Sequence, residues 1–237
     1  NLPKNADLVV KSTAVPNTNP EIRAAGKLGL NILSYPEALG WLTKTYDTIA
    51  ISGSHGKSTT AALTSLMLMK ANEDPTVIIG TKLKEFGDKN FRSGKSNLLV
   101  IEADEWRAAF LNYSPFITIV TNIDLEHLDF YKNLNNLKKT FLKFIERTRE
   151  GGGLILNHDD KNLYSLRSAI LKIAKKKKFK VFWYSTRNRP NLSRIKANLR
   201  IPGEHNLSNA MATLALARVL KIKESTALRA FSRYRGA

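Results

Sequence analysis

A glycine-rich turn holds the residues whose types and spacing best fit a chemical role. Residues 53–58 read Gly-Ser-His-Gly-Lys-Ser, between a β-branched run at 48–52 and a helical pattern at 58–70. A strand, a glycine turn, a Lys-Ser pair and a helix are the layout of a phosphate-binding loop. In such a loop Lys57 neutralises phosphate charge, the Ser58 hydroxyl can ligate Mg²⁺, and backbone N–H groups surround the phosphate oxygens.

The residues that we expect to contact a nucleotide are Gly53, Ser54, His55, Gly56, Lys57, Ser58 and Thr59. The alternative is an ordinary glycine-rich connection that exposes a lysine and binds nothing. The strand pattern before the turn and the helix pattern after it favour the phosphate loop.

Acidic residues follow a second strand pattern. Residues 98–101 form a continuous apolar run, which is typical of a strand covered on both faces, and 102–105 read Glu-Ala-Asp-Glu. Acidic side chains at the carboxyl end of a central parallel strand are well placed to meet Mg²⁺ at a phosphate loop. An exposed acidic loop, or a cap for a helix beginning near Trp106, is the alternative. The neighbouring phosphate loop favours the metal.

Two further segments place histidines beside apolar elements. His127 follows the apolar run 116–120 and stands near two acidic residues, in a chain with 4 histidines. A lone histidine is more often structural than a ligand. His205, Asn206 and Asn209 open an apolar helical pattern, and Asn206 is a possible helix cap. A cap alone does not explain the spacing of all three polar residues.

Together these segments resemble motifs of the Mur ligase family, whose ATP-dependent members share the short form of the loop with folylpolyglutamate synthases. The resemblance is carried by the loop, the Glu-Ala-Asp-Glu run, the Thr-Asn-Ile…His-Leu-Asp run at 121–129 and the Gly-x-His-Asn-x-x-Asn-Ala run at 203–210. Residues 12–22 are similar to the end of the family's UDP-binding domain. The histidine at position 55 is typical of two branches, one that acts on UDP-N-acetylmuramate and L-alanine and one that recycles murein peptides, and the segment 12–22 favours the first.

The resemblance implies roles for individual residues, with ATP and Mg²⁺ as cofactors. Lys57, Glu102 and His127 would be catalytic. Ser58, Glu102 and His127 would hold magnesium. The adenine contacts would be His205, Asn206 and Asn209. The related enzymes often continue Glu-Ala-Asp-Glu with Ser-Asp, whereas this chain has Trp106 and Arg107.

The implied reaction is ATP-dependent formation of an amide between UDP-N-acetylmuramate and L-alanine through an acyl phosphate, in the synthesis of peptidoglycan precursors. A murein-peptide recycling ligase or a ligase of the folylpolyglutamate type would share the same ATP machinery. From a different class, a basic P-loop ATPase that acts on nucleic acid is the remaining alternative.

Composition limits these choices. The 237 residues carry 38 Lys and Arg against 20 Asp and Glu, a net charge of +18, which raises the expectation of an anionic partner. Much of this charge lies at 172–180, where a solvated helix end is the simpler explanation because no nucleic-acid recognition module accompanies it. No apolar run approaches the roughly 20 residues of a membrane span. The absence of cysteine fits a cytoplasmic protein.

Alternating patterns predict an α/β fold with a mainly parallel, doubly wound sheet of the P-loop type, preceded by a partial Rossmann-like domain. The expected strands are 7–11, 32–33, 48–52, 76–79, 98–101, 116–120, 154–156 and 180–184. The expected helices are 20–28, 36–43, 58–70, 135–149, 163–174, 206–220 and 224–234. Residues 86–95 are expected to form a polar loop or a hairpin.

We expect two parts in this chain. Residues 1–44 would be the end of a UDP-binding domain, and residues 45–237 a central ATP-binding domain, with a linker near 44–47. The sequence starts at Asn1 inside a strand pattern, and it stops at 234–237, where the resemblance places the hinge into the family's C-terminal domain. We therefore expect a fragment without that domain, one that binds ATP with little turnover.

Overall fold

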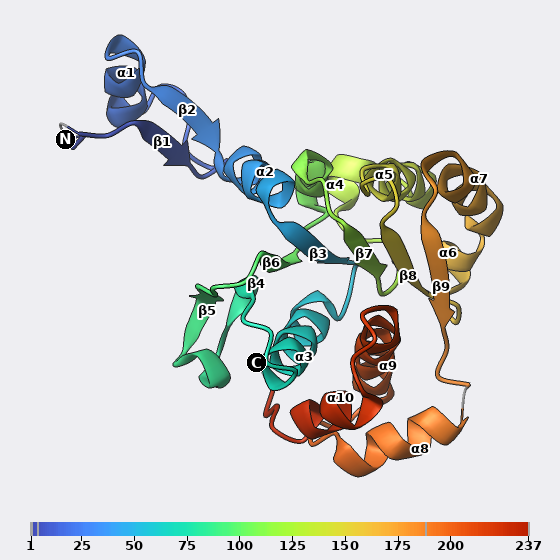
Figure 1. Ribbon diagram of the computed structural model, residues 1–237. Helices are drawn as coiled ribbons and strands as arrows, with labels where there is room; N and C mark the ends of the chain where they lie inside the picture. Colours follow the sequence, from blue (N-terminus) through green and yellow to red (C-terminus); the bar gives the residue numbers. More distant parts are fainter. Residues whose placement is uncertain (1, 4, 188, 237) are drawn as a thin grey trace.

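A mostly parallel sheet lies at the centre of the molecule (Figure 1). Its strands are β3 (Asp47–Ser52), β4 (Thr76–Leu83), β5 (Lys89–Arg92), β6 (Leu98–Glu102), β7 (Ile117–Val120), β8 (Gly153–Asn157) and β9 (Lys180–Tyr184). The computed structural model describes residues 2–3, 5–187 and 189–236, and within them the sheet has the order β5-β4-β6-β3-β7-β8-β9. The edge strand β5 is antiparallel to β4, and the other pairs are parallel. The predicted α/β fold is confirmed.

Helices cover both faces of this sheet (Figure 1). One face carries α3 (Lys57–Lys70), α8 (Arg189–Asn198), α9 (Glu204–Val219) and α10 (Glu224–Phe231). The other carries α2 (Tyr35–Thr45), α5 (Leu134–Glu146), α7 (Arg167–Lys177) and the 3₁₀ helix η2 (Trp106–Asn112). Short elements complete the chain: η1 (Lys84–Phe86), α4 (Leu128–Tyr131) and α6 (Lys161–Tyr164).

Alternate residues of each central strand enter different cores. Ile49 and Ile51 of β3 pack with α3 and α9, whereas Ala50 packs with η2 and α5. All three residues are at most 1% exposed. Burial on both faces explains why the central strands are continuous apolar runs, and it requires helices on both sides.

The N-terminal segment forms a separate two-stranded parallel sheet of β1 (Leu8–Lys11) and β2 (Asn31–Ser34), with α1 (Pro20–Lys27) between them. As predicted, α1 is capped by Asn19, whose side chain accepts hydrogen bonds from the backbone N–H groups of Glu21 and Ile22 at 2.9 and 3.4 Å. Figure 1 shows this segment projecting from the central sheet and joined to it through α2. Since α2 continues to Thr45 and β3 begins at Asp47, the expected linker shrinks to a single residue.

The structure corrects two local predictions and decides a third, in which a loop and a hairpin had both been expected. The expected helix 163–174 is two helices, α6 and α7, and the segment that forms α8 had not been predicted as a helix. Residues 86–95 form a hairpin, because β5 pairs with β4.

Within the described residues no helix is long and apolar enough to cross a membrane.

The core beneath η2 gives a first prediction. Phe110 is fully buried, with its ring centroid 4.4 Å from that of Phe144 and 5.3 Å from that of Phe141. We expect Phe110→Ala to lower the free energy of unfolding by about 3–5 kcal/mol, because it leaves a cavity between aromatic rings. Urea unfolding measures this, and Phe91→Ala, which removes a ring that is 51% exposed on β5, should change it by no more than about 0.5 kcal/mol. Equal losses would contradict the packing described here.

Candidate functional site

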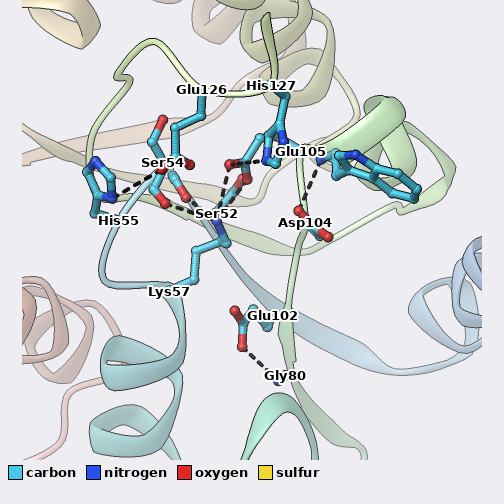
Figure 2. Close-up of polar contacts among 12 residues, drawn as sticks. Ser52, Ser54, His55, Lys57, Gly80, Glu102, Asp104, Glu105, Glu126 and His127 are labelled. Carbon is cyan, nitrogen blue, oxygen red and sulfur yellow. Dashed lines mark hydrogen bonds and ion pairs between the residues drawn. The ribbon is translucent and has the colours of Figure 1, made fainter. Parts of the chain in front are cut away.

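Parallel register brings three strand ends to one edge of the sheet. Ile51 of β3 lies opposite Glu102 of β6, and Ser52 lies opposite Val120 of β7. The connections that follow these strands therefore leave the sheet side by side, as expected for ligand sites in open parallel sheets. The glycine turn, the acidic run and the segment that ends in His127 meet there (Figure 2).

Two glycines of the turn have no room for a side chain. Gly53 has φ +136°, and a Cβ there would lie 2.1 Å from Thr121 Oγ1. Gly56 has φ +81°, and its Cβ would lie 2.3 Å from Asn209 Oδ1. Gly56 is also the residue that precedes α3, so the first turn of that helix points its N–H groups toward the loop. Backbone conformation and close approach both demand glycine at these positions.

The turn is bonded to the segment after β7. The Ser54 hydroxyl donates to the Asp124 carbonyl at 2.9 Å and accepts from the Asp124 N–H at 2.8 Å. The Thr121 hydroxyl donates to the His55 carbonyl at 2.6 Å, and the His55 N–H donates to Asn122 Oδ1 at 2.8 Å. These contacts fix the turn in shape, and they reveal a positioning role for Thr121 that the sequence did not suggest.

His55 itself points to the surface of the site. Its side chain is 60% exposed and lies between two carboxylates, 3.5 Å from Asp124 and 3.6 Å from Glu126. Since its backbone N–H is already bonded to Asn122, any contact of His55 with a nucleotide would come from the imidazole.

Lys57 is held by a buried carboxylate. Its ammonium donates to the Gly53 carbonyl at 2.7 Å and to both carboxylate oxygens of Glu105, at 3.0 and 3.2 Å (Figure 2). Glu105 is fully buried, and burial raises its pKa although the Lys57 charge opposes that shift. The hydroxyl of Tyr131 donates to the Glu105 carbonyl, and burial raises the pKa of Tyr131 to about 12. The sequence alone had left the role of Glu105 open.

Glu102 forms a second polar centre beside the loop. The Ser58 hydroxyl donates to Glu102 Oε1 at 3.0 Å, and the Gly80 N–H donates to Oε2 at 2.8 Å. The hydroxyl and the carboxylate offer oxygen atoms only, which is the donor set that Mg²⁺ prefers. The structure thus brings together two of the three predicted magnesium ligands.

The third predicted ligand, His127, belongs to a neighbouring group. Its Nε2 lies 3.9 Å from Glu105 Oε1, and its backbone has φ +55°. One possible ligand atom from each of Asp104, Glu105 and His127 lies within 4.8 Å of the others. This set mixes carboxylate oxygens with an imidazole nitrogen, a donor combination that suits a wider range of divalent metals than oxygen donors alone.

The predicted adenine contacts separate in space. Asn209 is 4% exposed, its amide oxygen faces Gly56, and its amide nitrogen has no hydrogen-bond partner. Asn206 donates to the Pro202 carbonyl at 2.6 Å, so it does not cap α9, which begins after Gly203. His205 is exposed and folds back over Gly203. Of the three, Asn209 is the one that the structure shows against the phosphate loop.

Two cavities open at this edge. One, of about 360 Å³, is lined by the phosphate-loop residues Ser54, His55, Gly56, Lys57, Ser58 and Thr59 together with Glu102. The other, of about 510 Å³, reaches from Lys57 and Glu102 to β1 and α2. The residues of the first cavity fit a nucleotide with Mg²⁺, since they combine a lysine, free helix N–H groups and an oxygen donor pair. The unsatisfied amide of Asn209 lies against Gly56 of the same loop.

Comparison with known proteins agrees with this geometry. A family model described as the Mur ligase middle domain matches residues 51–217. The chain belongs to the Mur ligase family. That match spans the phosphate loop, the acidic run, His127 and Asn209.

Two individual relatives of this chain carry the same name. A UDP-N-acetylmuramate–L-alanine ligase from Caldicellulosiruptor bescii is 36% identical over 247 residues, which cover 98% of this chain and 54% of that protein. A second relative of the same name, from Dictyoglomus turgidum, is 35% identical over 98% of this chain and 53% of its own length. This Mur ligase chain therefore spans about half the length of the curated relatives it matches.

One solved structure supports the fold. The UDP-N-acetylmuramate–alanine ligase from Thermotoga maritima superposes with a TM-score of 0.75 at 24% identity, over 98% of this chain and 55% of that one. The arrangement of strands and helices described above is thus shared with a Mur ligase of known structure.

The contact between Gly56 and Asn209 gives a second prediction. We expect Gly56→Ala to abolish binding of an ATP analogue, because the new Cβ displaces the Asn209 side chain and distorts the start of α3. The matched control is Gly87→Ala, which has a similar φ of +69° but open space around it. In urea unfolding Gly87→Ala should lose about 1 kcal/mol of stability because of its backbone conformation, and Gly56→Ala should lose more because its Cβ also meets Asn209. In calorimetric titration, at a temperature where both variants are folded, only Gly56→Ala should lose binding. Unchanged binding by Gly56→Ala would contradict the assignment of the loop.

Proposed function

We propose that this chain is the ATP-binding part of a ligase that joins L-alanine to UDP-N-acetylmuramate through an acyl phosphate, in peptidoglycan precursor synthesis. The observation that carries the proposal is the phosphate loop with Lys57 held beside Glu102 and Glu105, at the mouth of a cavity that leads to the N-terminal segment. The names of the relatives support the choice of acid and amine.

The chemistry follows from what each residue can hold. The Lys57 ammonium and the loop N–H groups would stabilise charge on the phosphoryl group that passes to the substrate carboxylate. Ser58 and Glu102 would hold one Mg²⁺, and His127 with Glu105 a second. Bound magnesium would supply positive charge to the phosphates and the incoming carboxylate. Asn209 would donate its free amide N–H to the part of the nucleotide that passes Gly56, and Asn206 and His205 would keep the expected adenine contacts.

The larger cavity supports a separate place for the acid substrate. It is lined by Lys57 and Glu102 at one end and by Lys11, Ser12 and Thr13 of the N-terminal segment at the other. A carboxylate bound at the first end would lie beside the phosphate loop. We therefore keep the division into an N-terminal part, residues 1–44, that contributes to acid binding, and an ATP-binding part, residues 45–237. A cytoplasmic location, where ATP is available, belongs to the same proposal.

The nucleotide part of the proposal predicts Mg²⁺-dependent binding. Calorimetric titration with a non-hydrolysable ATP analogue should show binding that disappears when Mg²⁺ is removed. Lys57→Ala should weaken it by at least about tenfold, a loss of about 1.4 kcal/mol. Lys70→Ala, which removes an exposed lysine from the far end of the same helix, is the control and should bind as the unaltered chain does. Equal affinity of the Lys57→Ala and Lys70→Ala variants for the ATP analogue would contradict the role of Lys57 in nucleotide binding.

The acid and amine are tested by product analysis. After long incubation with ATP and UDP-N-acetylmuramate, mass spectrometry should detect more amide with L-alanine than with the tripeptide L-alanyl-γ-D-glutamyl-meso-diaminopimelate, by roughly tenfold or more. A preference for the tripeptide would favour a recycling ligase. Steeply salt-dependent binding of DNA or RNA, without any amide product, would instead favour a nucleic-acid ATPase.

A further inference from the structure

Aromatic side chains form part of the wall of the larger cavity, the one of about 510 Å³. Trp106 lines it together with Tyr35 and Tyr113. Trp106 also lines a neighbouring cavity of about 180 Å³ between η2 and the start of α2, so its side chain stands where the two cavities meet. Trp106 is partly buried and belongs to neither hydrophobic core, so core packing does not explain its position. Its place between two cavities suggests that it contacts a ligand.

The backbone after Trp106 adopts a conformation that needs support. Arg107 and Ala108 have φ of +50° and +58°, so two successive residues with side chains occupy the left-handed region. Such strain persists only where surrounding contacts over-determine it, and it gathers at functional sites. The contacts are present here: Asp104 Oδ1 accepts from the Trp106 N–H at 3.0 Å, and the Ala108 N–H donates to the Glu105 carbonyl at 2.8 Å.

The strained turn also fixes a cation. The guanidinium of Arg107 lies 4.8 Å from the centroid of the Trp106 ring, and Arg107 lines the smaller cavity. Within residues 2–3, 5–187 and 189–236, no carboxylate forms a salt bridge with Arg107, and its side chain is exposed. The turn thus presents an apolar aromatic face toward one cavity and an unpaired positive charge beside it.

We propose that Trp106 and Arg107 recognise the acid substrate, Trp106 as a platform for its sugar ring and Arg107 as the partner of its anionic diphosphate. The inference rests on the proposed function and adds specificity-determining residues to it. A ligand that suits the cavity needs a carboxylate at the Lys57 end, an amphipathic ring against the indole and an anionic group within reach of Arg107. A sugar ring offers C–H groups to an aromatic face, and a diphosphate pairs well with a guanidinium.

The place of the pair separates it from the nucleotide. Neither Trp106 nor Arg107 lines the cavity of about 360 Å³ at the phosphate loop. The proposed contacts therefore concern the acid and not the nucleotide.

The test measures affinity for two ligands separately. In calorimetric titration, Trp106→Ser should weaken binding of both UDP-N-acetylmuramate and free N-acetylmuramate by on the order of tenfold, whereas Trp106→Phe should restore most of it. Arg107→Asp should weaken the UDP-sugar more than the free sugar, and Arg107→Lys should lie between. None of these variants should change the affinity for the ATP analogue. Trp41→Ser, which removes a tryptophan that is 52% exposed and outside both cavities, is the control.

A second measurement does not depend on loss of function. The chain has 3 tryptophans, so Trp41→Phe with Trp183→Phe leaves Trp106 as the only one. Its fluorescence should change on addition of either sugar ligand and saturate at the affinity found by calorimetry.

Each outcome separates this inference from the proposed function. Binding of the ATP analogue without binding of either sugar ligand at millimolar concentration, or sugar binding that Trp106→Ser leaves unchanged, would overturn the role of Trp106 and Arg107 alone. Equal loss of nucleotide and sugar affinity in Trp106→Ser would also overturn it, because the turn would then act through the shape of the whole site. Absence of nucleotide binding by the unaltered chain would refute the proposed function itself.

Discussion

The register of β3 between β6 and β7 is the constraint on which the whole site depends. Because Ile51 lies opposite Glu102, the glycine turn and the acidic run begin at the same level of the sheet. A slip of one residue would move Ile49 and Ile51 into the core that now holds Ala50, and would turn alternate side chains to the wrong face. Two differently filled cores thus fix the register, and the register fixes the site.

The glycine turn at 53–58 also depends on a buried ion pair, between Lys57 and Glu105. Removing Lys57 and Glu105 from water is costly unless their geometry is good and their remaining hydrogen-bonding groups are satisfied. Lys57 meets both conditions through Glu105 and the carbonyl of Gly53, and the Tyr131 hydroxyl fixes the backbone of Glu105. The lysine is therefore aligned before any phosphate arrives. Prior alignment of charge is what makes electrostatic stabilisation of a transition state effective.

The sequence predicts well those strands, turns and caps that a local pattern of residues controls. Continuous apolar runs identify the central strands, and the spacing of Gly53, Gly56, Lys57 and Ser58 identifies the loop, since each signal lies within a few neighbouring residues. The bounds of β9 and the cap of α1 by Asn19 were predicted for the same reason. The relation of Ser58 to Glu102 also followed, because parallel strands end at one edge.

What the sequence does not predict depends on turns and on distant partners. No apolar periodicity marks α8, whose residues are mostly polar, and neither proline nor glycine separates α6 from α7. Nothing in the residue types of Arg107 and Ala108 indicates a positive φ, because that conformation is imposed by contacts with Asp104 and Glu105. The burial of Glu105 against Lys57 is a consequence of that turn, so it too becomes visible only in three dimensions.

Two of the positive charges stabilise helix ends away from the site. Lys177 donates to the carbonyls of Glu146 and Thr148 at the end of α5, and Arg147 donates to the Leu111 carbonyl at the end of η2. Cations are favoured at helix C-termini, where unpaired carbonyls and the negative end of the helix dipole meet. Helices between parallel strands end at the amino edge of the sheet, opposite the phosphate loop. These two cations therefore stabilise helix ends and add to the positive potential of the molecule, whereas Lys57 and the loop are the groups that we propose to hold phosphate.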